Sequence, residues 1–209
     1  MKLYTKFKYT VLERGTVVLE QAVEQIERWA TETGEFQAIA WDKMPEIYLY
    51  MDQVITYMDK QLKLFERNGH GRLLTSSMIN NYVKDNVLAR PEQKKYSKEH
   101  LAMLTIICML KQVLSIQDIS QLLQFLIAST SKTELYDHFC ALQANVLKET
   151  CSRVNQTAPQ GKQALMALAL ELSIEANARQ IAAQRILSEF RTEEPSKNQK
   201  KKEKIKPHE

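Results

Sequence analysis

The sequence has few glycines and prolines, and it lacks long uncharged apolar runs. Five of each residue occur among 209 residues, and no proline lies between Glu92 and Ala158. Sheet-rich folds need many tight turns, which these two residues supply best. A membrane-spanning helix needs about 18 consecutive apolar residues with few charges. The sequence therefore predicts an all-α fold, with room for a small β-wing, and no membrane partner.

Signals for secretion and for catalysis are also missing. The charged N-terminus, Met1 to Lys8, has no apolar block behind it, and three irregularly spaced cysteines indicate a reduced, cytoplasmic setting. Catalytic carboxylate pairs, a nucleophile beside a base and glycine-rich phosphate loops do not occur. His138, Cys140 and Cys151 lack the spacing and the fourth ligand of a zinc site. We therefore expect no enzyme, no cofactor and no metal.

Positive charge is unevenly distributed along the chain. The formal net charge is +4, yet residues 67–95 alone carry +4 and residues 191–209 carry +3. Either segment can meet a polyanion such as DNA, or can simply form a solvated surface. Charge alone leaves both interpretations open.

Helical periodicity and capping residues divide the chain. Apolar spacing predicts helices over residues 17–31, 46–66, 77–86, 132–154 and 162–190, and two more that begin after Ser97 and Ser115. Residues 89–96 contain Pro91 and no periodicity, which indicates a loop. The two last helices are long enough to form an antiparallel hairpin.

One stretch carries a family resemblance. Ile79 to Leu88 is followed by Pro91, by Lys94-Lys95-Tyr96-Ser97, and then by leucines and isoleucines at helical spacing up to Ile119. This order resembles the DNA-binding domain of MerR-type regulators, in which a recognition helix precedes a basic wing and a helix pair. Pro45 to Val54, followed by Met78 to Lys84, looks like a bacterial family of unknown function that carries this region, which would extend the match to residues 42–126.

The resemblance implies that double-stranded DNA is the partner. A helix fits the major groove, asparagine can pair with adenine, and lysine and arginine neutralise phosphates. Tyrosines of this region can either pack the wing on the helix or donate a hydroxyl to phosphate. The candidate DNA-binding residues are Ser76, Ser77, Asn80, Asn81, Tyr82, Lys84, Arg90, Lys94, Lys95 and Tyr96.

The sequence also departs from the MerR pattern. Asn80 stands where arginine is usual, Asn81 where tyrosine is usual, and Lys94 replaces the arginine of the wing. The base sequence that such a helix reads is therefore not transferable from the family. Asn80 and Asn81 can also be read as a plain polar helix face.

Four regions follow from these observations. Residues 1–41 form an N-terminal helical extension, 42–131 a MerR-like winged helix-turn-helix domain, 132–190 a helical dimerisation or effector region, and 191–209 a basic disordered tail. The resulting hypothesis is a transcriptional regulator that forms a homodimer, with a small molecule or a protein as effector. The alternative is a helical protein-interaction module without DNA binding.

Overall fold

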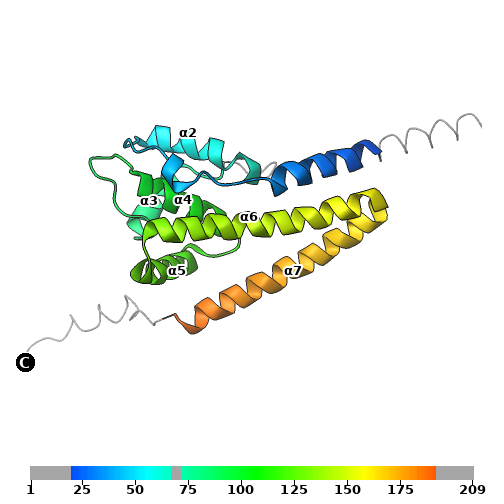
Figure 1. The fold of residues 1–209 in the computed structure, drawn as a ribbon. Helices are drawn as coiled ribbons and strands as arrows, with labels where there is room; N and C mark the ends of the chain where they lie inside the picture. The colour runs from blue at the N-terminus through cyan, green and yellow to red at the C-terminus, as the bar shows by residue number, and fades with distance from the viewer. Residues whose placement is uncertain (1–19, 67–71, 192–209) are drawn as a thin grey trace, which may run out of the picture.

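The computed structural model describes residues 20–66 and 72–191, and these residues are predominantly helical (Figure 1). This confirms the all-α prediction. Helix is present over residues 20–34, here called the N-terminal helix. The further elements are η1 (Trp41–Lys43), α2 (Met51–Gln61), η2 (Lys63–Phe65), α3 (Ser76–Lys84), α4 (Lys98–Leu110), α5 (Ile116–Ser129), α6 (Lys132–Thr157), η3 (Ala158–Gln160) and α7 (Lys162–Glu189). The expected tail beyond residue 191 lies outside the described residues.

Hydroxyl side chains begin three of the helices. Thr75 Oγ1 accepts a hydrogen bond from the Met78 backbone N–H at 3.2 Å, and Ser115 and Ser131 do the same three residues upstream of Asp118 and Glu134. Each cap satisfies a backbone donor that the first helical turn leaves free. The predicted starts of α5 and α6 are thereby confirmed, and α3 begins one residue before its predicted start.

The second helix is shorter than its sequence pattern predicts. We expected helix over residues 46–66, but α2 covers only Met51–Gln61. Leu49 is instead extended, because its backbone exchanges two hydrogen bonds with Tyr96. At the other end, Leu62 leaves the helical region and the chain tightens into η2. Apolar spacing over residues 45–50 could not reveal this, because the pairing partner lies more than forty residues away.

Most of the apolar core surrounds α4. Its residues from Leu101 to Cys108 are all buried, so this helix is enclosed on every side. Helices α2, α3 and α5 and the first turns of α6 cover it, and we call this assembly the head. In Figure 1 the labelled helices α2 to α5 gather at one end of the molecule, while α6 and α7 extend away from them.

The predicted region boundaries at residues 41 and 131 do not match the packing. Tyr136, near the start of α6, is fully buried in the head, and its hydroxyl donates a hydrogen bond to the Ile39 carbonyl at 2.8 Å. Trp41 packs against the same ring, with 6.1 Å between ring centroids. Both segments therefore belong to the head, since removing either would expose the buried tyrosine.

A second, smaller core lies at the far end of α6, and we call it the distal core. Ala30 of the N-terminal helix, Cys151 and Val154 of α6, and Leu165 and Leu168 of α7 bury one another there. Gly34 ends the N-terminal helix where a Cβ would stand only 3.0 Å from the Cys151 Cβ. After Gly161, α7 runs back along α6 toward α5 (Figure 1), which confirms the predicted hairpin.

The outer side of the hairpin is apolar and exposed. Met166 is 58% exposed, and Leu170, Ile174 and Ile181 are exposed with it. The spacing of these four residues places them on one side of α7. Leu165 and Leu168, in the first turns of α7, lie on a different side and are buried. Of the helices in the described parts of the chain, none has the length and apolar character required to cross a membrane.

Candidate functional site

Helix α3 separates its residues cleanly into two faces. Ile79 and Tyr82 are buried against the head, while Ser77, Asn81 and Lys84 are exposed. These three exposed residues are spaced by four and then by three positions, which puts them on one stripe of the helix. Ser76 and Asn80 are exposed beside that stripe. The outer surface of α3 is therefore polar along its whole length and carries one cation.

Both ends of α3 are fixed. Upstream of it, the Lys111 ammonium of the α4–α5 turn donates a hydrogen bond to the Leu73 carbonyl. At its end, Asn86 adopts a positive φ of 56°, and the Val87 and Asn86 backbone N–H groups donate to the carbonyls of Tyr82 and Val83. This is the Schellman arrangement, in which asparagine tolerates the left-handed conformation. The polar face of α3 is thus held at a defined angle to the head.

A tight hairpin follows α3. The Lys95 backbone N–H donates to the Glu92 carbonyl at 2.8 Å, and the two residues between them, Gln93 and Lys94, have φ values of 49° and 65°. Two positive φ values in a two-residue loop define a type I′ turn, which normally uses Asn-Gly. Sequence inspection read residues 89–96 as an irregular loop because this chain has neither asparagine nor glycine there.

The hairpin is tied to the segment before α2. Leu49 and Tyr96 exchange two backbone hydrogen bonds, of 2.9 and 2.8 Å, in an antiparallel bridge. Both side chains are buried in the head. The pairing therefore holds the hairpin to the start of α2, with α3 connected directly to the same hairpin.

Eight of the ten candidate residues are accessible. Lys95 is half-buried, and the other seven are exposed: Ser76, Ser77, Asn80, Asn81, Lys84, Arg90 and Lys94. Tyr82 and Tyr96 are only 4% and 2% exposed. Burial raises the pKa of Tyr82 to about 12 and also raises the pKa of Tyr96. This corrects their assignment to the surface, because both rings fill the core beneath it.

His100 supports the base of the hairpin. Its Nδ1 accepts a hydrogen bond from the Ser97 backbone N–H at 3.1 Å, and its ring packs edge-on against Tyr96. The other ring nitrogen is buried near the backbone of Ala89 and Arg90 without a well-aligned hydrogen bond. Burial lowers the pKa of His100 below its usual value, so the neutral ring is the form that fits.

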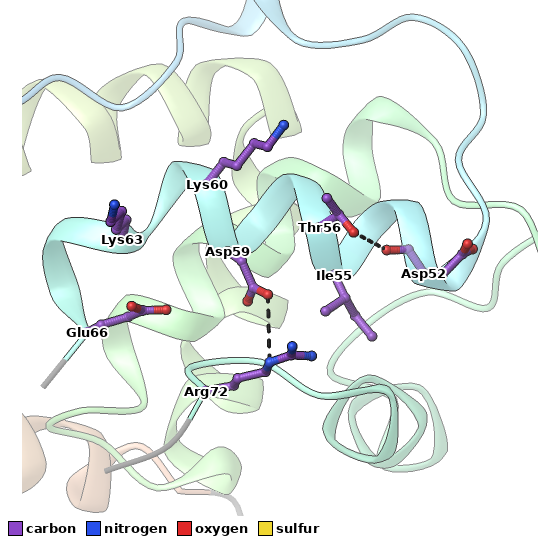
Figure 2. Close-up of a pocket in the computed structure, with 8 residues that line it drawn as sticks. All are labelled: Asp52, Ile55, Thr56, Asp59, Lys60, Lys63, Glu66 and Arg72. Atoms are coloured by element: carbon purple, nitrogen blue, oxygen red, sulfur yellow. Dashed lines mark hydrogen bonds and ion pairs between the residues drawn. The ribbon is translucent and has the colours of Figure 1, made fainter. Parts of the chain in front are cut away.

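A cavity of about 600 Å³ lies beside α2 and the Arg72 segment (Figure 2). Three carboxylates and three cations line it, and Asp59 and Arg72 form an ion pair with 4.0 Å between charged atoms. Because the lining charges balance, the cavity selects neither an anion nor a cation. It therefore gives a weaker case for a binding site than the polar surface of α3.

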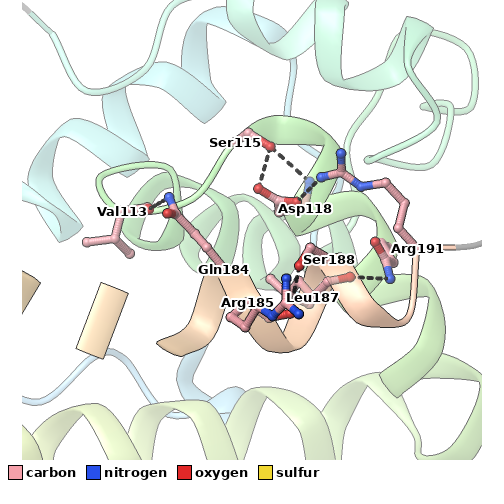
Figure 3. A network of polar contacts seen from close by, with 9 residues as sticks. Val113, Ser115, Asp118, Gln184, Arg185, Leu187, Ser188 and Arg191 are labelled. Atoms are coloured by element: carbon pink, nitrogen blue, oxygen red, sulfur yellow. Dashed lines mark hydrogen bonds and ion pairs between the residues drawn. The ribbon is translucent and has the colours of Figure 1, made fainter. Parts of the chain in front are cut away.

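A polar network fastens α7 to α5 (Figure 3). Arg191, just after α7, pairs with Asp118 in the first turn of α5, and Ser115 donates a hydrogen bond to the same carboxylate at 2.7 Å. The Ser115 hydroxyl is the main cause that lowers the pKa of Asp118, and Arg191 adds to it. Gln121 donates to the Leu187 carbonyl at 3.1 Å. These hydrogen bonds and the ion pair hold the end of α7 against α5.

The cysteines are poorly suited to chemistry. Burial raises the pKa of Cys108 to about 11 and also raises that of Cys140 and Cys151, so the thiolate form is disfavoured. Within residues 20–66 and 72–191, no three His, Cys, Asp or Glu side chains come together as metal ligands would.

Comparison with known proteins gives one match. Residues 39–139 match the model of a family described as "Domain of unknown function (DUF1836)". This agrees with the expected likeness to a family of unknown function, and its limits coincide with the head, from Ile39 to the buried first turns of α6. No curated protein and no solved structure matches the chain significantly.

The environment of His100 predicts acid sensitivity. The usual pKa of 6.5 applies to the unfolded chain, and the folded value is lower. Stability is therefore complete above about pH 6.5 and falls as the pH drops toward the folded pKa, because only the unfolded chain takes up the proton. His100→Gln keeps an acceptor at the third helical position without titrating, so its melting temperature should change less between about pH 7.5 and 5.5 than that of the wild type. The exposed His138→Gln should retain the wild-type dependence; equal acid sensitivity of wild type and His100→Gln would contradict this role.

The turn geometry predicts a stabilising substitution. A non-glycine residue in the left-handed region costs about 1 kcal/mol, so Lys94→Gly should raise the free energy of unfolding by roughly 0.5–1 kcal/mol in urea titration. Lys94→Ala is the matched control, since it removes the same charge but keeps the Cβ and should give no such gain. A glycine variant no more stable than the alanine variant would show that the turn is unstrained.

Proposed function

We propose that this chain binds double-stranded DNA as a MerR-like winged helix-turn-helix protein. In this proposal α3 enters the major groove, and the hairpin of residues 91–96 lies as a wing against the phosphate backbone. The observation that carries the proposal is the combination of a polar outer stripe on α3 with a basic hairpin that backbone hydrogen bonds tie to the same head. A rigid pairing of helix and wing is what groove binding requires.

Each exposed group has a role suited to its chemistry. Asn81 lies near the middle of the outer stripe, where its amide can pair with an adenine edge, and Ser77 can reach a base or a phosphate. Lys84, Arg90 and Lys94 are exposed cations that can neutralise phosphates and so set orientation and affinity.

The positions of unusual backbone support the same surface. In the described parts of the chain, the non-glycine residues with positive φ are Asn86, Gln93 and Lys94, and all three lie between the end of α3 and the hairpin tip. The cap at Asn86 and the turn at Gln93 and Lys94 fix how this surface is presented. A lysine kept at the tip, where glycine would be more stable, is consistent with a charge that must be presented there.

The direct test is the salt dependence of DNA binding. A site should first be recovered by selecting genomic fragments with the purified chain at about 0.15 M salt, where nonspecific contacts are screened. On that site, the triple variant K84A/K94A/K95A should bind more than about tenfold more weakly. The slope of log affinity against log salt should fall by nearly three, one phosphate for each lysine.

A matched control, K148A/K162A/R185A, removes three cations from the helical hairpin of α6 and α7 instead. These side chains are exposed on α6 and α7, so affinity and slope should stay close to the wild type. An unchanged slope in the first triple variant would refute the docking surface, and recovery of no site would refute sequence-specific DNA binding.

The exposed stripe of α7 supports a homodimer in this proposal. Leu170, Ile174 and Ile181 follow heptad spacing, which is typical of a helix that pairs with another helix. A two-fold dimer would place two α3 helices for a palindromic site. Ala167, Ala178 and Ala182 beside the stripe leave room for the large side chains of a second, antiparallel copy.

Ile174→Asp should therefore shift the chain to the monomer in light scattering without lowering its melting temperature as a monomer, because this side chain is exposed. Ile47→Asp, an equally drastic change at an exposed position of the head, should leave the oligomeric state unchanged. A wild-type chain that is monomeric at all practical concentrations would contradict the dimer.

The alternative function is a helical protein-interaction module. The observation that favours it is the same apolar surface, since exposed apolar patches of this extent mark contacts with other proteins. Binding through such a surface would be nearly independent of salt and of the three lysines, which separates this function from DNA binding.

A further inference from the structure

A second exposed surface lies on the outer side of the Leu49–Tyr96 pairing. Side chains alternate across a strand, so the neighbours of two buried residues point outward. Tyr48 and Tyr50 flank Leu49 and are 56% and 52% exposed, and Lys95 precedes Tyr96. We call Tyr48, Tyr50 and Lys95 the ribbon face.

The ribbon face is organised around one contact. The Lys95 ammonium lies over the Tyr50 ring, 5.7 Å from its centroid. The Tyr50 backbone is fixed in turn, because its N–H donates to the Gln53 side-chain oxygen at 2.9 Å. A cation over an aromatic face is held by the negative charge of the ring face, so Tyr50 presents Lys95 in a preferred position.

Two half-exposed tyrosines are not required by the packing beneath them, which Leu49 and Tyr96 already complete. What they add to the surface is an apolar ring, a hydroxyl donor and an adjacent cation. The backbone of duplex DNA offers the matching groups, namely apolar sugar, phosphate oxygens and negative charge.

We propose that the ribbon face is a second backbone contact of the DNA surface, in which Tyr48 and Tyr50 bind the sugar–phosphate strand beside the phosphate that Lys95 neutralises. This inference rests on the proposed function. A phosphate oxygen at about 2.8 Å from the Lys95 ammonium lies within about 8.5 Å of the Tyr50 ring centroid, close enough for the ring or its hydroxyl to meet the same strand.

The hydroxyl and the charge can be separated by measurement. The double variant Y48F/Y50F keeps both rings and removes only the hydroxyls, so its affinity should fall about 3- to 10-fold with an unchanged salt slope. Lys95→Ala should reduce the slope by nearly one. Tyr50→Ala should reduce affinity and also part of the slope, because Lys95 loses the ring that positions it.

Trp29→Ala is the matched control, since Trp29 is 51% exposed but lies on the N-terminal helix, which packs in the distal core. Its affinity and slope should equal those of the wild type. If K84A/K94A/K95A weakens binding while Y48F/Y50F and Tyr50→Ala bind like the wild type, the ribbon face is not a DNA contact although the proposed function stands. If the wild type binds no duplex, the proposed function itself fails and the inference with it.

Discussion

The backbone bridge between Leu49 and Tyr96 is the constraint on which the candidate surface depends. It joins a segment before α2 to a hairpin after α3, so this hairpin is held to the start of α2 as well as following the end of α3. It also buries the side chains of Leu49 and Tyr96 in the core of the head and leaves the flanking Tyr48 and Tyr50 exposed. Without this pairing the hairpin would have only the two-residue turn of Gln93 and Lys94, and an isolated hairpin is marginal in water.

The second fixed element is α4. Because all its central residues are buried, every other helix of the head must cover part of it, and this requirement brings α3 into place. The first turns of α6 also cover the core, because Tyr136 is buried there against Ile39 and Trp41. The matched family region, residues 39–139, thus runs from Ile39 to the first turns of α6 and contains the residues that enclose α4.

Local signals in the sequence were enough for the helices but not for the contacts between distant segments. Hydroxyl caps such as Ser115 and Ser131 act within one turn, so their effect can be read from neighbouring residues. The shortened α2 and the type I′ turn could not be read in this way. Leu49 is extended because of a partner forty-seven residues away, and Lys94 occupies a conformation that its residue type disfavours.

The difference between local signals and contacts of distant segments also applies to the candidate surface and to the helical hairpin of α6 and α7. The polar α3 residues that the resemblance implies are exposed, but residue type alone cannot separate exposed tyrosines from buried ones. Tyr48 and Tyr50 lie outside the MerR-like stretch and are exposed, whereas Tyr82 and Tyr96 lie within it and are core. Helix α7 carries apolar residues on two sides, and only tertiary packing decides which side is covered.

The contact of α7 with the first turn of α5 links the helical hairpin to residues that lie beside α3. Asp118 accepts hydrogen bonds from both Arg191 and Ser115, and Ser115 also lines a depression that contains Asn81 and Asp85 of α3. These contacts are polar and partly exposed, so each one contributes little on its own and can be exchanged for water. Helix α3, by contrast, is held in the head by the buried side chains of Ile79 and Tyr82. The end of α7 is therefore held to α5 largely by partly exposed polar contacts, whereas α3 is held by buried apolar side chains, and we expect local opening at the end of α7 before opening at α3.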